Sequence, residues 1–391
     1  MTPPVRAIAG DGFGARLALF YAGLFVVVGV QLPFFPVWLK AKGLDAEAIG
    51  LVLAAPMAVR VLAVPVAARI ADRYGALRRL LIATSFAAAI GYAVVGWAEG
   101  LLPILAAVAL ASALATTTGP LADAYALKGL GLRGRAYGPV RLWGSAAFIA
   151  ANLGAGVASG YIAPTGYIWL MVAALAVTAA AALGLRPLRP DGAPERSVPR
   201  RRARLLPSPG FLAIAAAASL VQASHAVYYG FSTLDWAAKG LSGTAIGALW
   251  ALGVVAEIAL FAASARLPAA LGPRALLGIG AAGAAVRWSA MALDPPIALL
   301  PLLQCLHGLS FGASYLGAVQ FLARAAPDGE AATAQGDLST IQGIAMAAAT
   351  GLSGVLYGSF GSLAYAAMAV CAGLGGVIAL LAPHLQRGRM G

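Results

Sequence analysis

The sequence predicts an all-α membrane protein with twelve transmembrane helices in two pseudo-symmetric six-helix bundles. Three observations lead to this fold class. Of its 391 residues, 61% are hydrophobic and only 10% are charged, whereas soluble domains carry about 25% charged residues. Apolar runs of membrane length follow one another along the whole chain, and a motif from the first half recurs in the second.

Each apolar run is expected to be one helix. A helix needs about 20 apolar residues to cross a bilayer, and lipid offers no hydrogen-bond partner to an open backbone. The eleventh run is interrupted by Asp337 and Gln342. The expected spans are 15–39, 47–68, 78–98, 101–125, 138–160, 163–185, 209–235, 242–263, 275–293, 297–322, 333–357 and 362–383.

The basic residues give the orientation. If the spans are correct, 21 of the 27 Lys and Arg residues fall on the side of the two termini, three fall on the other side and three lie inside helices. Cytoplasmic loops carry such an excess of Lys and Arg, so both termini are expected to be cytoplasmic. The net charge of +13 is explained in this way, and no nucleic-acid partner is expected.

A repeat separates two halves. The stretch from Lys42 to Gly50 shares KGL and IG with the stretch from Lys239 to Gly247, at an offset of 197 residues. We expect an N-terminal bundle at 1–185, an Arg- and Pro-rich cytoplasmic linker at 186–208 and a C-terminal bundle at 209–391. Duplicated halves place a transport site near the membrane midplane.

Several motifs resemble those of one family. Asp72, Arg73 and Gly75, followed by Arg78 and Arg79, are similar to a loop signature of the major facilitator superfamily, although Ala68 stands where Gly is usual. Other stretches resemble the lactose permease and phenylpropionate permease branch, which contains proton symporters. These are Pro33–Leu39, His225–Tyr229, Trp250–Glu257, Arg287–Trp288 and Leu306–Gly308.

The resemblance implies the fold and the roles of individual residues. It implies the major facilitator fold, with 72–79 as a conformational loop. The position of the proton-carrying glutamate in lactose permease falls on Ser310, so that site does not carry over intact. The resemblance and the charges inside the helices together give the expected residues. Those for substrate binding are Asp123, Arg141, Arg60, Tyr228 and Gln304, and those for proton coupling are Glu257, Arg287, His307 and His225.

The intramembrane charges also permit a structural interpretation. A charge at the bilayer centre costs roughly 3 kcal/mol or more, and a pair between Glu257 and Arg287 would reduce that cost. Asp123 and Arg141 could likewise be a structural ion pair or a ligand site. Arg60 has no acid one turn away and suits either a carboxylate ligand or cavity water.

Other chemistries are not supported. No lysine follows a glycine, so a phosphate-binding P-loop is absent, and three histidines without HExxH or cysteine pairs do not match the usual zinc patterns. The GxSxG match at 308–312 lies in a predicted helix rather than in a strand-turn-helix elbow. We therefore expect no enzyme, no catalytic residue, no cofactor and no metal.

The sequence predicts a proton-coupled symporter that imports a small organic solute. The resemblance favours an aromatic carboxylate similar to phenylpropionate, with a sugar or nucleoside as the alternative. Drug efflux and a non-transporting membrane sensor are further alternatives. The expected partners are a small-molecule substrate, protons and the lipid bilayer. We expect a monomer in the inner (cytoplasmic) membrane.

Overall fold

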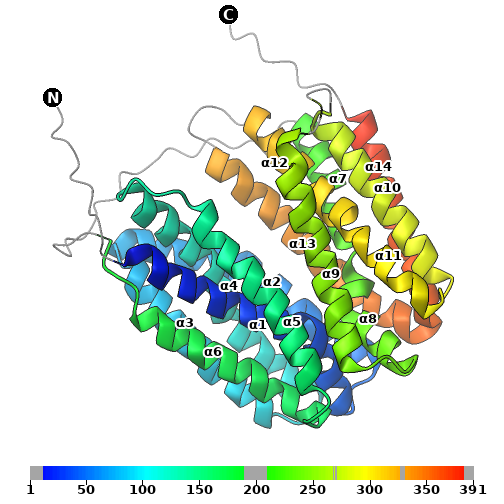
Figure 1. Ribbon diagram of the computed structural model, residues 1–391, viewed down its shortest axis with the longest axis horizontal. Coiled ribbons are helices and arrows are strands. Elements are labelled where there is room, and N and C mark those ends of the chain that lie inside the picture. Colours follow the sequence, from blue (N-terminus) through cyan, green and yellow to red (C-terminus); the bar gives the residue numbers. More distant parts are fainter. Residues whose placement is uncertain (1–11, 189–208, 267, 269–270, 326–330, 383–391) are drawn as a thin grey trace, which may run out of the picture. The chain divides into compact units, whose positions relative to one another are not determined.

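The computed structural model describes residues 12–188, 209–266, 268, 271–325 and 331–382. Throughout these ranges the regular structure is helical, with short turns between helices (Figure 1). From residue 189 on, the expected linker lies outside the described residues.

The N-terminal half contains long helices joined by short turns. The first turn after a helix ends with Gly43 at φ +82°, and the turn at 75 has Gly75 at φ +57°, a left-handed conformation that glycine adopts without steric cost. The helices are α1 (Phe13–Ala41), α2 (Ala46–Tyr74), α3 (Leu77–Trp97), α4 (Leu101–Gly131), α5 (Gly138–Ala158) and α6 (Tyr167–Leu183), the last preceded by η1 (Pro164–Gly166).

The C-terminal half has more interruptions. Two of its expected spans, 209–235 and 297–322, are each divided into shorter helical pieces. The elements are α7 (Pro209–Ala223), α8 (Ala226–Ala238), α9 (Gly243–Ala263), η2 (Ser264–Arg266), α10 (Pro273–Ala292), η3 (Ile297–Leu299), α11 (Leu300–Cys305), η4 (Gly308–Ala313), α12 (Ser314–Ala325), α13 (Ala331–Phe360), η5 (Gly361–Leu363) and α14 (Ala364–Leu381).

The chain forms two compact units. The first comprises Met1–Leu44, Ala58–Pro199 and Leu241–Ala248, and the second comprises Asp45–Met57, Arg200–Gly240 and Leu249–Gly391. In the first unit α1 packs on α5 and α6, and α3 packs on α4 and α6, as Figure 1 shows for α3 and α6. In the second unit α7 packs on α13 and α14, and α10 packs on α12 and α14. The internal packing of the second unit thus repeats that of the first, as the sequence repeat predicts.

The all-helical membrane architecture is confirmed. Within the described chain, ten helical stretches are long and apolar enough to cross a membrane. One of them, Ala334–Leu381, contains both α13 and α14, and α5 is not among the ten. Helix α5 has 21 residues and includes Arg141, Asn152 and four glycines, which lower its hydropathy. With α5 counted and α13 separated from α14, each of the twelve predicted spans corresponds to helical structure.

Side chains explain the break between α7 and α8. The Ser224 hydroxyl donates to the carbonyl of Val221 at 2.6 Å, and Nδ1 of His225 lies 3.1 Å from the same oxygen and 3.2 Å from that of Gln222. Ser224 also accepts the indole N–H of Trp288 at 3.0 Å. Polar side chains that bond to nearby carbonyls in this way compete with the helical ladder.

A π-helical turn, η4, interrupts the tenth expected span. Its carbonyls at Ser310 and Phe311 accept the Ser314 hydroxyl at 2.8 and 2.9 Å. Such turns occur mostly inside α-helices and often at functional sites. This segment contains the GxSxG match, and its helical structure agrees with the expectation that no nucleophile elbow exists.

A lysine closes the corresponding turn in each unit. Lys42 pairs with Glu99 in the first unit, and Lys239 pairs with Asp235 at 2.9 Å and with Asp294 in the second. Partial burial by itself would lower the pKa of Lys239, but its hydrogen bonds to Asp294 and Asp235 outweigh burial and raise the pKa. Lys42 and Lys239 are equivalent positions of the sequence repeat.

The contact between α10 and α12 predicts a position-specific effect of one methyl group. A Cβ at Gly280 would lie 2.8 Å from the backbone nitrogen of Ser314, whereas a Cβ at Gly278 would meet only Leu380 at 3.6 Å. We expect Gly280→Ala to destabilise the purified protein by about 1–3 kcal/mol. Gly278→Ala, in the same helix, should be neutral or stabilising by up to about 1 kcal/mol. Thermal unfolding in detergent measures both, and equal melting temperatures would contradict this packing.

Candidate functional site

Eight of the nine expected substrate-binding and proton-coupling residues gather in two clusters, one in each unit. The cluster of the first unit contains Asp123 on α4 and Arg141 on α5. The cluster of the second unit contains His225, Tyr228, Glu257, Arg287, Gln304 and His307. Arg60 on α2 belongs to neither, because no hydrogen bond, ion pair or ring contact within the described ranges involves it, and its side chain is exposed.

Two tyrosines hold the carboxylate of Asp123. The hydroxyl of Tyr21 donates to Oδ1 at 2.6 Å, and the hydroxyl of Tyr137 donates to the same oxygen at 2.8 Å. Tyr21 comes from α1, and Tyr137 stands at the start of α5, one turn before Arg141. One oxygen of the carboxylate thus accepts two hydrogen bonds, from side chains of two different segments.

Arg141 does not pair with Asp123. Its guanidinium carbon lies 3.9 Å from the centre of the Phe25 ring and 5.7 Å from that of Tyr21. No hydrogen bond or ion pair of Arg141 occurs among the described residues. The structural ion pair that the sequence permits is therefore not formed, and aromatic faces stabilise the cation instead.

Arg287 is the centre of the second cluster. It is 1% exposed and donates to three neutral groups. Its Nη1 lies 3.0 Å from Nδ1 of His307 and 3.4 Å from the Ser310 hydroxyl, and its Nη2 bonds to the Gln304 amide oxygen. No acidic side chain of the described chain lies within ion-pair distance of Arg287, so the structural pair with Glu257 is also not formed.

Aromatic rings and an amide complete the surroundings of Arg287. Its guanidinium carbon lies 4.5 Å from the centre of the Tyr228 ring and 4.6 Å from that of Trp288. The Gln304 amide nitrogen donates to the Tyr228 hydroxyl at 2.9 Å and to the Leu249 carbonyl at 3.0 Å. Gln304 therefore fixes the positions of Arg287 and Tyr228 at once.

The hydrogen-bond partners of His225 and His307 suit one neutral tautomer of each. Arg287 can only donate, so Nδ1 of His307 accepts and the proton is on Nε2, which lies 3.9 Å from Oε2 of Glu257. At His225 the two carbonyls near Nδ1 can only accept, so Nδ1 carries the proton. Its Nε2 then accepts the Ser310 hydroxyl at 3.2 Å.

The loop residues 72–79 have a different neighbourhood. Arg78 donates to the carbonyls of Leu185 at 2.6 Å and Leu183 at 3.4 Å, and so satisfies the end of α6. Arg73 stacks on the neighbouring ring of Tyr74 at 5.7 Å. Asp72 and Arg79 are exposed.

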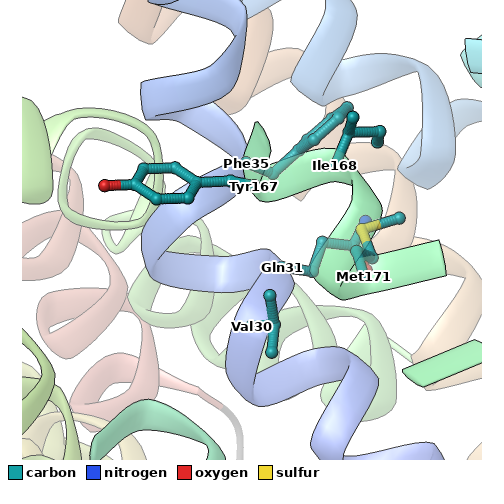
Figure 2. A pocket seen from close by; sticks show the side chains of 6 residues that line it. All are labelled: Val30, Gln31, Phe35, Tyr167, Ile168 and Met171. Carbon is teal, nitrogen blue, oxygen red and sulfur yellow. The ribbon is translucent and has the colours of Figure 1, made fainter. Parts of the chain in front are cut away.

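The first unit also contains a small hollow. Figure 2 shows its lining, with Val30, Gln31 and Phe35 from α1 and Tyr167, Ile168 and Met171 from α6. The side-chain amide of Gln31, which lines the hollow, donates to the Tyr92 hydroxyl at 3.4 Å. None of the expected site residues lines it. No group of three or more metal-ligating side chains occurs among the described residues.

Sequence reasoning missed three residues of the first cluster, Tyr21, Phe25 and Tyr137. Tyr137 stands four residues before Arg141, a spacing that puts two side chains on one face of a helix, and this was a usable signal. For Tyr21 and Phe25 the sequence contains no such signal, because their contacts with α4 and α5 are tertiary.

The comparisons with known proteins identify the family. The sequence model described as "MFS_1 like family" matches residues 15–367. The chain belongs to the MFS_1 like family. It is thus a multi-pass membrane protein and a transporter of the major facilitator superfamily, and the relatives named below are transporters rather than enzymes.

Two relatives are similar in sequence to this MFS_1 like protein, and one solved structure has a similar fold. It is 34% identical over 325 residues to the "Probable 3-phenylpropionic acid transporter" of Escherichia coli (strain K12), covering 78% of this chain and 81% of the relative. It is 30% identical over 321 residues to the "Maltose permease" of Geobacillus stearothermophilus, covering 81% and 80%. A mutant form of the nucleoside transporter NupG has the same fold, with a TM-score of 0.82, 15% identity and coverage of 94% and 98%.

The position of Gln304 predicts a coupled stability effect. Gln304→Leu removes an acceptor from the buried guanidinium of Arg287, and we expect a loss of about 1.5–3 kcal/mol in unfolding free energy. The double variant with Arg287→Met should be less destabilised than the sum of the single variants, because the charge and its acceptor then leave together. Thermal unfolding of the four proteins measures this.

Cys305→Ala serves as the matched control, because Cys305 is adjacent in sequence and exposed. It should leave the melting temperature unchanged. Strictly additive effects of Gln304→Leu and Arg287→Met would contradict the contact.

Proposed function

We propose that the protein is a proton-coupled symporter that imports a small aromatic carboxylate by alternating access. In this proposal it resides in the inner (cytoplasmic) membrane as a monomer, with both termini in the cytoplasm. The single observation that carries the substrate class is Arg141. Its guanidinium carbon lies 3.9 Å from the centre of the Phe25 ring, and its N–H groups bond to no other described residue, an arrangement suited to an aromatic ligand with a carboxylate.

The first cluster supplies the substrate site in this proposal. Arg141 would bind the carboxylate through two parallel N–H donors, and Phe25 and Tyr21 would contact the aromatic ring. The 34% identical relative named a 3-phenylpropionic acid transporter supports this class. Arg60, exposed on α2, is a second candidate for the carboxylate.

The second cluster supplies proton coupling in this proposal. The hydrogen bonds favour neutral histidines, because protonating Nδ1 of His307 would place an imidazolium against the guanidinium of Arg287. Glu257 remains as the group that gains and loses the proton, and His307 connects it to Arg287. Arg287, His307 and His225 then adjust the affinity of Glu257 for its proton.

A sugar or nucleoside is the second candidate substrate. The maltose permease relative and the nucleoside-transporter fold support it. The carboxylate of Asp123 would accept sugar hydroxyls, as carboxylates do in many carbohydrate sites. Uptake of radiolabelled 3-phenylpropionate, maltose and uridine into proteoliposomes with an imposed pH gradient tests the two candidates directly, because only the true class accumulates.

The substrate assignment predicts the effect of Arg141→Lys. The charge remains, but the planar pair of donors is lost, so we expect saturable uptake of 3-phenylpropionate to fall by a factor of about 10 or more, equivalent to about 1.4 kcal/mol. The melting temperature should stay within error, because Arg141 makes no hydrogen bond to another described residue. Uptake kinetics in proteoliposomes measure the change.

Arg266→Lys is the control for this substitution. Arg266 is exposed in η2 and belongs to neither cluster, so its variant should transport normally. Normal uptake by Arg141→Lys would remove Arg141 from the substrate site.

The coupling assignment predicts a split between two kinds of transport in Glu257→Gln. Glutamine mimics the protonated carboxyl, so the variant should lose accumulation driven by a pH gradient. It should retain exchange of external for internal substrate, because exchange requires no net proton release. Vesicles with a pH gradient, and then preloaded vesicles without one, separate the two activities.

Glu47→Gln, at an exposed position in the first turn of α2, is the matched control and should retain both activities. Accumulation by Glu257→Gln against a gradient would assign the proton to another group, with His307 as the next candidate.

A further inference from the structure

The first cluster contains an acceptor and a set of donors that do not bind each other. Both tyrosine hydroxyls bond to Oδ1 of Asp123, and no hydrogen bond between described residues reaches Oδ2. The N–H donors of Arg141 are likewise unused within the described chain. Both side chains are half-buried. A half-buried carboxylate oxygen and a half-buried guanidinium in the same bundle normally find partners, so this pair of unused groups needs an explanation.

Tyr21 links the two groups. Its hydroxyl donates to Asp123 at 2.6 Å, and Arg141 lies over its ring at 5.7 Å from the ring centre. Tyr137 packs edge-to-face on Tyr21, with ring centres 6.2 Å apart, and its hydroxyl bonds to the same carboxylate oxygen. The carboxylate and the guanidinium are therefore held beside one aromatic surface but kept from closing into a salt bridge.

We propose that the substrate carries a hydrogen-bond donor in addition to its carboxylate, and that it is a hydroxyl-substituted aromatic carboxylate. Arg141 binds the carboxylate, and Oδ2 of Asp123 accepts the hydroxyl. This inference rests on the proposed function and specifies its substrate class. Asp123 then determines specificity, and Tyr21 and Tyr137 are positioning residues that aim its second oxygen.

Electrostatics explain why the donor is needed. An anionic substrate bound to Arg141 also meets the negative charge of Asp123, which repels it. A substrate hydroxyl would instead donate a hydrogen bond to Oδ2 of Asp123. Such hydrogen bonds to a charged oxygen are stronger than those between neutral groups. An acid without the hydroxyl leaves the carboxylate oxygen both desolvated and unpaired, which is the usual way in which a polar site rejects an analogue that lacks a donor.

Three ligands of similar shape test the proposal without any substitution. Purified full-length protein is titrated with 3-(4-hydroxyphenyl)propionate, with its methyl ether and with 3-phenylpropionate, and the series is repeated with the 3-hydroxy isomer and its ether. The methyl ether keeps the oxygen but removes the donor. We expect one of the hydroxy acids to bind about tenfold or more tightly than both its ether and the unsubstituted acid.

Asp123→Asn provides a second, reciprocal measurement. Its amide keeps an oxygen for the two tyrosines and can turn its N–H donors towards the ligand, so the ratio of hydroxy acid to ether affinity should fall to about one or invert. A general loss of affinity lowers the binding of the hydroxy acid and of its ether alike, so it leaves the ratio of the two affinities unchanged. Glu47→Gln, outside the site, should keep the wild-type ratio.

The outcomes separate this inference from the proposed function. Binding of none of the acids overturns the proposed substrate class and this inference together. Equal affinity for hydroxy acid, ether and unsubstituted acid leaves the proposed function standing and overturns the inference. An unchanged ratio in Asp123→Asn overturns the role of Asp123. The inference is supported if the protein binds the hydroxy acid selectively and this selectivity is lost in Asp123→Asn but kept in Glu47→Gln.

Discussion

The second unit is organised around a buried guanidinium that forms no ion pair with any described acidic residue. Arg287 is 1% exposed, and among the described residues its guanidinium donates to the neutral acceptors His307, Ser310 and Gln304 and lies over two aromatic faces. A charge in lipid surroundings must be compensated, and here several weak interactions do so jointly. Because none of them is an ion pair, Arg287 can exchange partners without separating two opposite charges in an apolar medium.

In the first unit, too, the charged side chains contact neutral groups rather than each other. Tyrosine hydroxyls bind the carboxylate of Asp123, and aromatic rings face the guanidinium of Arg141. A closed salt bridge between the two would have to be broken before a ligand bound, at a cost taken from the binding energy. In the proposed function, the separation of the two charges by the hydroxyl and ring of Tyr21 leaves both able to bind a ligand.

Hydropathy and charge bias were sufficient to predict the helices, because a membrane admits few backbone structures. They were not sufficient for the breaks at His225 and Gly308, since these depend on which carbonyls the side chains of Ser224, His225 and Ser314 reach. The sequence spacing predicted that Asp123 and Arg141 lie in the same bundle. It did not predict that Tyr21 contacts both of them, because the hydrogen bond between Tyr21 and Asp123 joins residues 102 positions apart in sequence.

The π-turn at Gly308–Ala313 sets the rotation of one end of its helix against the other. Such a turn bonds each residue to the fifth along and so holds one residue more than an α-helical turn. Removing that residue would restore regular winding but rotate one flank of the helix by about 100° against the other. His307 and Ser314 lie on opposite flanks of the turn, and only one could then keep its present neighbours. The winding of these six residues therefore decides which side chains of the tenth span face the buried guanidinium of Arg287.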